Sequence, residues 1–271
     1  MCLSALGLAT LAVVRWGSFV RQERPPRRGG YRTNALETLR AATVTLYAAA
    51  SSGILVAGFG GRFFMRILAA TSPDSLLGAK TQAEEEVGRI TVSGSAFLIV
   101  FGGLLAGLVL AGAYRVARRW LPATAWQAGV VASLVVFAVF GAGQDILAAD
   151  NKDFRLLSPV WLAVLLIGLT MVLFGATMGA VHDRLDRGMP TLSKQGRALA
   201  AYAPLLTFAV TIVVLPAVVL VVLLGGVLAP VVDGVAAAPT LVRWGKRAVP
   251  FAALIATFVV ASNAYSVLTL D

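Results

Sequence analysis

The stretch AAASSGILVAGFGGRFFMRILAATSPD, residues 48–74, decides the fold. It begins as part of an apolar run long enough to cross a bilayer. It then carries Arg62 and Arg66, one helical turn apart, directly after a glycine pair. Ser72-Pro73 ends it, because the residue before a proline is disfavoured in a helix. Arginine is rare so close to hydrocarbon, which makes this stretch the first candidate for function as well as for fold.

Composition places the chain in a membrane. Hydrophobic residues make up 58% of the sequence and charged residues 13%, whereas a soluble domain is typically about 45–50% apolar and about 25% charged. The apolar runs are long and do not alternate with polar residues, so they predict helices rather than the strands of a barrel. We therefore predict an all-α fold, a polytopic transmembrane helical bundle.

Six apolar runs predict six spans, with seven as the alternative. They cover about residues 41–61, 96–114, 125–147, 160–181, 198–227 and 249–268. The nearly uncharged region 198–242 has two interpretations. One is a single span kinked at Pro216, followed by an external amphipathic segment, PTLVRWGKRAVP. The other is a helical hairpin that returns Arg243, Lys246 and Arg247 to the cytoplasm. We favour the kinked span, because the hairpin's second limb is short for a crossing.

Charge indicates the orientation. Residues 1–34 form an apolar run, which is itself a candidate seventh span, and a basic linker, and residues 35–271 form the transmembrane helical domain. The linker and the arginines that follow the second span lie in the cytoplasm by the positive-inside rule. Abundant Ala, Val, Gly and Arg with little Lys fit a GC-rich bacterial genome, so we predict a bacterial plasma membrane.

The net charge of +10 is explained by basic loops beside the membrane. Membrane lipids are therefore the predicted partners, other membrane proteins are further candidates, and nucleic acid is not expected. The sequence does not indicate an oligomeric state.

Four residues are candidates for a ligand or ion pathway. Arg62 and Arg66 share a helix face, and Gln144 and Asp145 enter the outer end of the third apolar run. Four interpretations stay open. The arginines extend to the outer interface, or they bind an anionic lipid headgroup or anionic solute. Alternatively, they pair with Asp145 and lock the first helix to the third, or they line a polar path through the protein.

Small residues predict two helix contacts, one at Gly103 and Gly107 and the other at Gly175 and Gly179. The chain has one cysteine and one histidine, His182, so neither a metal site nor a cofactor is expected. His182 is predicted to lie at a helix end, where it favours the dipole. No phosphate-binding, metalloprotease or serine-hydrolase motif is present, so no catalytic residue is predicted.

The segments GGRFFMRILAATSPDS, residues 60–75, and DFRLLSPVWLAV, residues 153–164, resemble uncharacterised multi-pass membrane proteins of actinobacteria. That resemblance implies no activity. The leading hypothesis is a non-enzymatic membrane accessory or assembly protein. The second is a small transporter or channel that moves an anionic solute, a lipid or a proton past Arg62, Arg66 and Asp145. The third is an enzyme that acts on lipid headgroups at the outer face.

Overall fold

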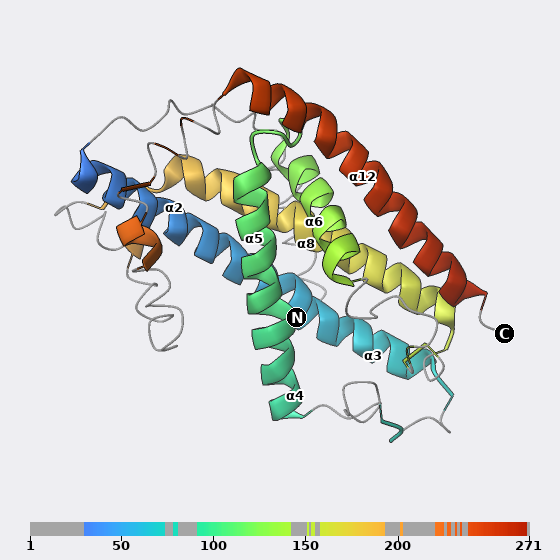
Figure 1. Ribbon diagram of the computed structural model, residues 1–271. Helices are drawn as coiled ribbons and strands as arrows, with labels where there is room; N and C mark the ends of the chain where they lie inside the picture. The colour runs from blue at the N-terminus through green and yellow to red at the C-terminus, as the bar shows by residue number, and fades with distance from the viewer. Residues whose placement is uncertain are drawn as a thin grey trace.

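The computed structural model shows a bundle of long helices (Figure 1). It describes residues 30–73, 78–80, 91–141, 151, 153–154, 158–192, 201–202, 220–224, 227–228, 231, 234 and 238–269. Every secondary-structure element within those residues is a helix, so the predicted all-α class is confirmed.

Four helices are long and apolar enough to cross a membrane: Tyr31–Thr71, Gly94–Ala117, Val160–Gly188 and Pro239–Leu268. A fifth apolar helix, Ala125–Phe140, is shorter. These helices are compatible with a multi-pass membrane protein. The count of six spans stays a prediction, because the outer end of the third span and most of residues 198–227 lie outside the described residues.

The first helix is longer than the apolar run that predicted it. It joins α2 (Tyr31–Ser52), η1 (Gly53–Gly60) and α3 (Gly61–Thr71) into one rod of 41 residues. Its end at Thr71, just before Ser72-Pro73, confirms the predicted stop.

The start of this helix corrects the prediction. The sequence placed a basic linker up to residue 34 and a span from about Ala41, whereas the helix already begins at Tyr31. Asn34, Thr38 and Arg40 are buried in the bundle. The helix thus starts inside the predicted linker, where residues 31–33 are exposed and Asn34 is buried.

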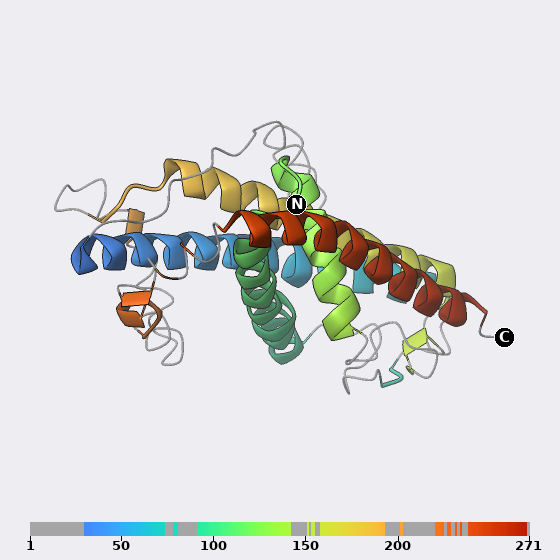
Figure 2. The ribbon, with the colours of Figure 1, turned by 45° about the horizontal axis from the view of Figure 1, so that its top comes forward.

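Two π-helical segments meet where the second helix crosses the first. The second helix joins α4 (Val92–Phe97), η3 (Leu98–Leu105) and α5 (Ala106–Ala117), and its α5 part crosses the long first helix (Figures 1 and 2). A Cβ added to Gly103 would lie 2.7 Å from the Gly53 carbonyl oxygen, and one on Gly107 would lie 2.5 Å from the Ala49 oxygen. The backbones therefore touch, as only small residues allow.

A second close crossing joins α6 (Ala125–Gly141) to α8 (Val160–Gly188). Gly129 lies against the backbone of Gly175, and a Cβ on Gly175 would lie 2.6 Å from the Ser133 Cβ. Ser133 also donates its hydroxyl to the Met171 carbonyl, at 2.9 Å. Backbone contact and one interhelical hydrogen bond together hold this pair.

The last helix, α12 (Pro239–Leu268), differs from the favoured prediction. The segment PTLVRWGKRAVP is not a separate external piece, because the helix is continuous through Pro250. Gly245 lies directly under the Trp120 indole, which follows α5. The basic residues at the start of α12 therefore lie at the same end of the bundle as the end of α5. The hairpin alternative had placed them there.

Alternating helix directions bring the charges together at one end of the bundle, here called the basic end. The helices α5 and α8 end there, and α2, α6 and α12 begin there, as contacts between their ends show. Its charged residues are Arg32, Glu37, Arg40, Arg115, Arg118, Arg119, Asp183, Arg184, Asp186, Arg187, Arg243, Lys246 and Arg247. Arg62 and Arg66 lie toward the opposite end.

We predict that Gly175→Ala destabilises the protein and that Gly168→Ala, on the same helix, does not. A Cβ at Gly175 would collide with α6, whereas a Cβ at Gly168 has nothing within 4 Å. Overpacking of this kind costs about 1–3 kcal/mol. Thermal unfolding of the two purified variants in detergent measures the difference, and equal midpoints would contradict this packing.

Candidate functional site

The two arginines singled out in the sequence lie on α3, away from the charges of the basic end. Arg66 is exposed on α3, and Arg62 is partly buried one turn earlier. From Ala41 to Gly61 the helix rises about 30 Å at about 1.5 Å per residue, which matches the hydrocarbon core. Arg62 follows this run directly, and Arg66 lies one turn beyond it.

Arg62 has an unusual local environment. Its Nε atom is buried and has no hydrogen-bond partner among the described residues. Gln144 and Asp145, the predicted partners in a pathway, lie outside the described residues. The lock between Arg62 and Asp145 therefore stays a prediction. The predicted glycine pairs lie at the two helix crossings described above.

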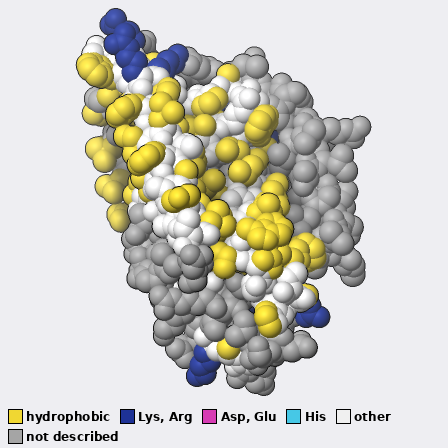
Figure 3. All heavy atoms as spheres, turned by 90° about the vertical axis from the view of Figure 1, so that its right-hand side faces the viewer, with side chains coloured by type: hydrophobic (Ala, Val, Ile, Leu, Met, Phe, Trp, Pro, Cys, Tyr) yellow, Lys and Arg dark blue, Asp and Glu magenta, His cyan; other side chains and the backbone are white. Residues whose placement is uncertain are grey.

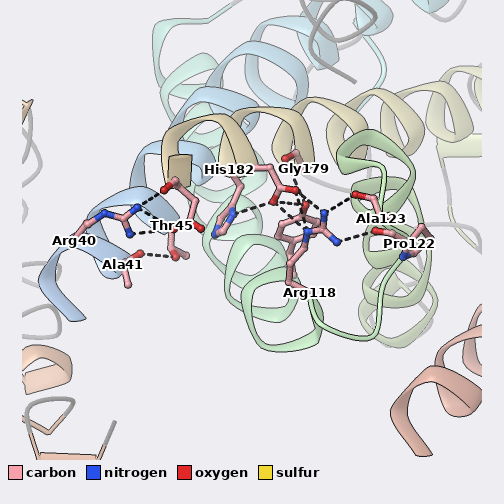
Figure 4. A network of polar contacts seen from close by, with 11 residues as sticks. Arg40, Ala41, Thr45, Arg118, Pro122, Ala123, Gly179 and His182 are labelled. Carbon is pink, nitrogen blue, oxygen red and sulfur yellow. Dashed lines mark hydrogen bonds and ion pairs between the residues drawn. The ribbon is translucent and has the colours of Figure 1, made fainter. Parts of the chain in front are cut away.

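The densest group of polar contacts lies at the basic end and centres on Arg118 and Asp183, both buried (Figure 4). The Arg118 Nη2 donates to Asp183 Oδ2 at 2.6 Å, and its Nε lies 3.1 Å from each carboxylate oxygen. The same guanidinium donates to the carbonyls of Pro122 and Ala123, at 2.7 and 2.9 Å. One side chain thus joins the end of α5, the α5–α6 turn and α8.

Tyr114 completes the ligands of the Asp183 carboxylate. Its hydroxyl donates to Asp183 Oδ1 at 2.9 Å, and its ring stacks under the Arg118 guanidinium at 5.6 Å. The carboxylate thus has both an ion-pair partner and a neutral donor. Burying an ion pair is tolerated when extra hydrogen bonds satisfy it in this way.

His182 corrects a prediction. It was expected at a helix end, but α8 continues to Gly188, and His182 is buried with its ring edge against Tyr114, 5.0 Å between centroids. Its Nδ1 lies 3.6 Å from Asp183 Oδ1, which is beyond hydrogen-bond range. Neither ring nitrogen has a hydrogen-bond partner among the described residues.

A second buried arginine joins the first helix to α8. Arg40 donates from Nε to the Met189 carbonyl at 2.8 Å and from Nη1 to Asp186 Oδ1 at 3.1 Å. Its Nη2 also bonds the Asp186 carbonyl. Because these carbonyls belong to the last turn of α8 and the residue after it, Arg40 satisfies acceptors that a helix C-terminus leaves open.

The pKa of Arg118, which lies just outside the candidate span Gly94–Ala117, is raised. Burial opposes its charged form, but the hydrogen bond and charge of Asp183 outweigh that effect. Arg118 therefore stays charged at physiological pH. The Tyr202 hydroxyl donates to the Pro190 carbonyl at 2.9 Å.

One open pocket of about 600 Å³ lies beside the Arg40 contacts at the end of α8. Its lining residues are Tyr47, Arg184, Leu185, Arg187, Gly188, Met189, Pro190 and Ala201. Within the part of the chain that the structure describes, no group of three His, Cys, Asp or Glu side chains is placed to hold a metal ion.

Sequence reasoning missed this network. Arg118 was counted only as a topology charge, and the predicted fourth span ended at about residue 181, before Asp183 and Asp186, which lie in the last part of α8. The available signal was the spacing of the two acids, one helical turn apart at the end of an apolar run. Trp120, which follows α5, packs against α12.

We predict strong coupling between Arg118 and Asp183 in a double-mutant cycle. Removing one partner of a buried pair costs about 3–5 kcal/mol, so Arg118→Gln and Asp183→Asn each lower the thermal midpoint strongly. The double variant loses less than the sum, by about 0.5–3 kcal/mol. Arg66→Gln, at an exposed arginine, is the control and leaves stability nearly unchanged. Strict additivity would show that the pair does not lock the bundle.

Comparison with known proteins adds no family to this description. No protein-family model matches the sequence, and neither a curated protein nor a solved structure matches it. What the chain does must therefore be inferred from its own residues and contacts.

Proposed function

We propose that this chain is a non-enzymatic accessory or assembly protein of a bacterial plasma membrane. One observation carries the proposal. The buried charges at the basic end are used to join helices: Arg118 to Asp183, and Arg40 to Asp186. A charge that is fully hydrogen-bonded within the chain is committed to holding the fold.

The helix crossings support the same proposal. At Gly53–Gly103 and at Gly129–Gly175 the backbones are in contact, so neither crossing leaves room for a solute between its helices. A transporter needs a polar path that opens to both sides of the membrane, with its site near the middle. At these two crossings the protein is built for close packing instead.

We further propose that the basic end faces the cytoplasm, because Lys and Arg are retained on that side. The helix α8 ends at the basic end and α12 begins there, so the chain between them crosses the membrane an even number of times. If the chain between α8 and α12 crosses the membrane twice, as in the hairpin, the protein has seven spans from residue 31 onward. If that chain does not cross, the protein has five. The single kinked span favoured by the sequence crosses once and would place the end of α8 and the start of α12 on opposite sides of the membrane.

The second candidate function, a small transporter or channel for an anionic solute, a lipid or a proton, is favoured by one observation. Arg62 holds a buried Nε without a partner among the described residues, just after a π-helical segment. Such segments occur often at functional sites, and a cation at the hydrocarbon boundary attracts anions.

Cysteine labelling tests which side of the membrane each end of the bundle faces, and so whether the number of spans from residue 31 onward is odd or even. In a Cys2→Ser background, we expect a membrane-impermeant maleimide to label Thr71→Cys and Thr269→Cys in intact spheroplasts. Gly188→Cys and Arg243→Cys, at the basic end, should react only after permeabilisation. If Thr269→Cys reacts only after permeabilisation while Thr71→Cys reacts in intact spheroplasts, the number of spans from residue 31 onward is even. That result would contradict the proposed topology.

Flux through proteoliposomes separates the two functions. For a non-enzymatic accessory protein, chloride, phosphate and proton flux with the purified chain should equal that of protein-free vesicles. Arg62→Gln and its exposed neighbour Arg66→Gln should leave that background unchanged. A protein-dependent flux that Arg62→Gln reduces about tenfold or more, and Arg66→Gln does not, would overturn the proposal in favour of transport.

A further inference from the structure

The pocket at the end of α8 has a lining of two kinds. Arg184 and Arg187, both exposed, supply its positive charge. Most of the other lining residues are apolar or aromatic, among them Tyr47, Leu185 and Met189. Its volume of about 600 Å³ lies within the range of about 300–1,000 Å³ that is usual for small-molecule sites. This lining fits a ligand that has one anionic part and one apolar part.

The apolar wall of the pocket is part of the folded core. Val44, Met189 and Tyr202 form a buried cluster, and Tyr47 and Ala201 pack against it. The Tyr47 hydroxyl also donates to the Ala201 carbonyl at 3.1 Å, which joins two residues of the lining. Packing and this hydrogen bond therefore fix the shape of the wall.

The basic end has more positive charge than its acids neutralise. Its described charged residues are ten Lys or Arg and three acids. Each acid already contacts a buried arginine: Asp183 binds Arg118, whereas Asp186 and Glu37 both contact Arg40. The described part of this end therefore keeps a positive excess, which favours an anion in the pocket.

The chain that continues from the pocket adds no acid. Between Asp186 and Asp233 the sequence has no Asp or Glu, although it has Arg187, Lys194 and Arg197. Any part of that stretch beside the pocket brings no carboxylate to the two arginines. The neighbouring chain thus offers positive charge only, and an anion in the pocket must come from elsewhere.

The end of α8 does not repel an anion as a bare helix C-terminus does. The open carbonyls of a helix end together carry about half a negative charge. Here Arg40 donates to the Asp186 carbonyl and to the Met189 carbonyl just beyond the helix. Its charge offsets those carbonyls, so they do not cancel the positive field of Arg184 and Arg187.

The pocket lies near the level where hydrocarbon meets headgroups. Tyr47 is about 9 Å along the first helix from Ala41, where the apolar run begins, and Arg184 and Arg187 follow the apolar part of α8. On the face of the molecule shown in Figure 3, hydrophobic side chains cover the described surface between Lys and Arg side chains at either end. An amphiphile at this level can reach both parts of the lining.

We propose that this pocket binds the phosphate-bearing headgroup of an anionic phospholipid. The phosphate lies at Arg184 and Arg187, and the start of the acyl chains lies on the apolar wall. Basic pockets between transmembrane helices on the cytoplasmic side bind anionic headgroups in this way, and the proposed orientation puts the basic end on that side. A free phosphate ion would meet the same arginines but would leave the wall uncovered. The site goes beyond the accessory or assembly role and does not depend on it.

Lipid binding by the purified full chain tests the site. Native mass spectrometry in mild detergent compares phosphatidylglycerol with phosphatidylcholine of identical acyl chains. We expect phosphatidylglycerol to bind about tenfold more tightly, and Arg184→Gln with Arg187→Gln to weaken its binding about tenfold. Arg243→Gln with Arg247→Gln is the matched control, because it removes two exposed arginines from the same end of the bundle. It should leave that affinity nearly unchanged.

A second pair of variants keeps both arginines. A Cβ on Gly188, which lines the pocket, has nothing within 4 Å, so Gly188→Leu fits the fold and takes up part of the pocket. It should weaken phosphatidylglycerol binding about as much as the loss of the two arginines. Gly168→Leu, on the same helix and equally uncrowded but outside the lining, should not. All these positions are exposed or uncrowded, so each variant should unfold at the wild-type temperature.

Three results would overturn the proposal. Equal affinity for phosphatidylglycerol and phosphatidylcholine would show that the pocket takes no anionic headgroup and is covered by the chain itself or by bulk lipid. Equal losses from the two arginine pairs would show a general attraction to the basic end. Inorganic phosphate that binds as tightly as phosphatidylglycerol would show that the apolar wall is unused. None of these results bears on flux through proteoliposomes, so the site and the accessory role fail separately.

Discussion

Helices inside a bilayer gain little from burying apolar side chains against one another, because lipid tails are equally apolar. Their association depends on close backbone approach and on polar bonds between helices. Both are present here, with glycine crossings at Gly53–Gly103 and Gly129–Gly175 and a buried arginine network at the basic end. The rest of the bundle depends on this combination. The crossings set how closely the helices approach, and the network sets which ends meet.

The arginine network also explains why charged residues are tolerated inside the bundle. Arg118 binds Asp183 and two carbonyls, and Tyr114 supplies a further donor to the carboxylate. A partly satisfied ion pair would be worse than an apolar contact, whereas this one is fully bonded. Both side chains are buried, so these hydrogen bonds offset the cost of removing the two charges from water. His182 is buried beside this pair, has no hydrogen-bond partner among the described residues, and packs as an aromatic ring against Tyr114.

The outer face of α12 follows from a different constraint. The inner side of this helix carries small residues such as Gly245 and Ala256, which allow it to lie on α6 and α8. Its aromatic residues are all directed away from the bundle. Among the described helices, none covers these rings. One side of α12 therefore packs on the bundle, and its aromatic side faces away from the described helices.

The sequence by itself determined the fold class, the apolar runs, the stop at Ser72-Pro73 and the glycine pairs, because length, hydropathy and residue size act locally. It also placed Arg62 and Arg66 at the end of an apolar run. Only the tertiary structure decided that Arg118 bonds Asp183, that His182 is buried, and that α12 begins at the basic end and runs unbroken through Pro250. The physical reason is that these features depend on which helices are neighbours. Hydropathy shows how far a helix extends, but a neighbour is chosen by contacts between residues far apart in the chain.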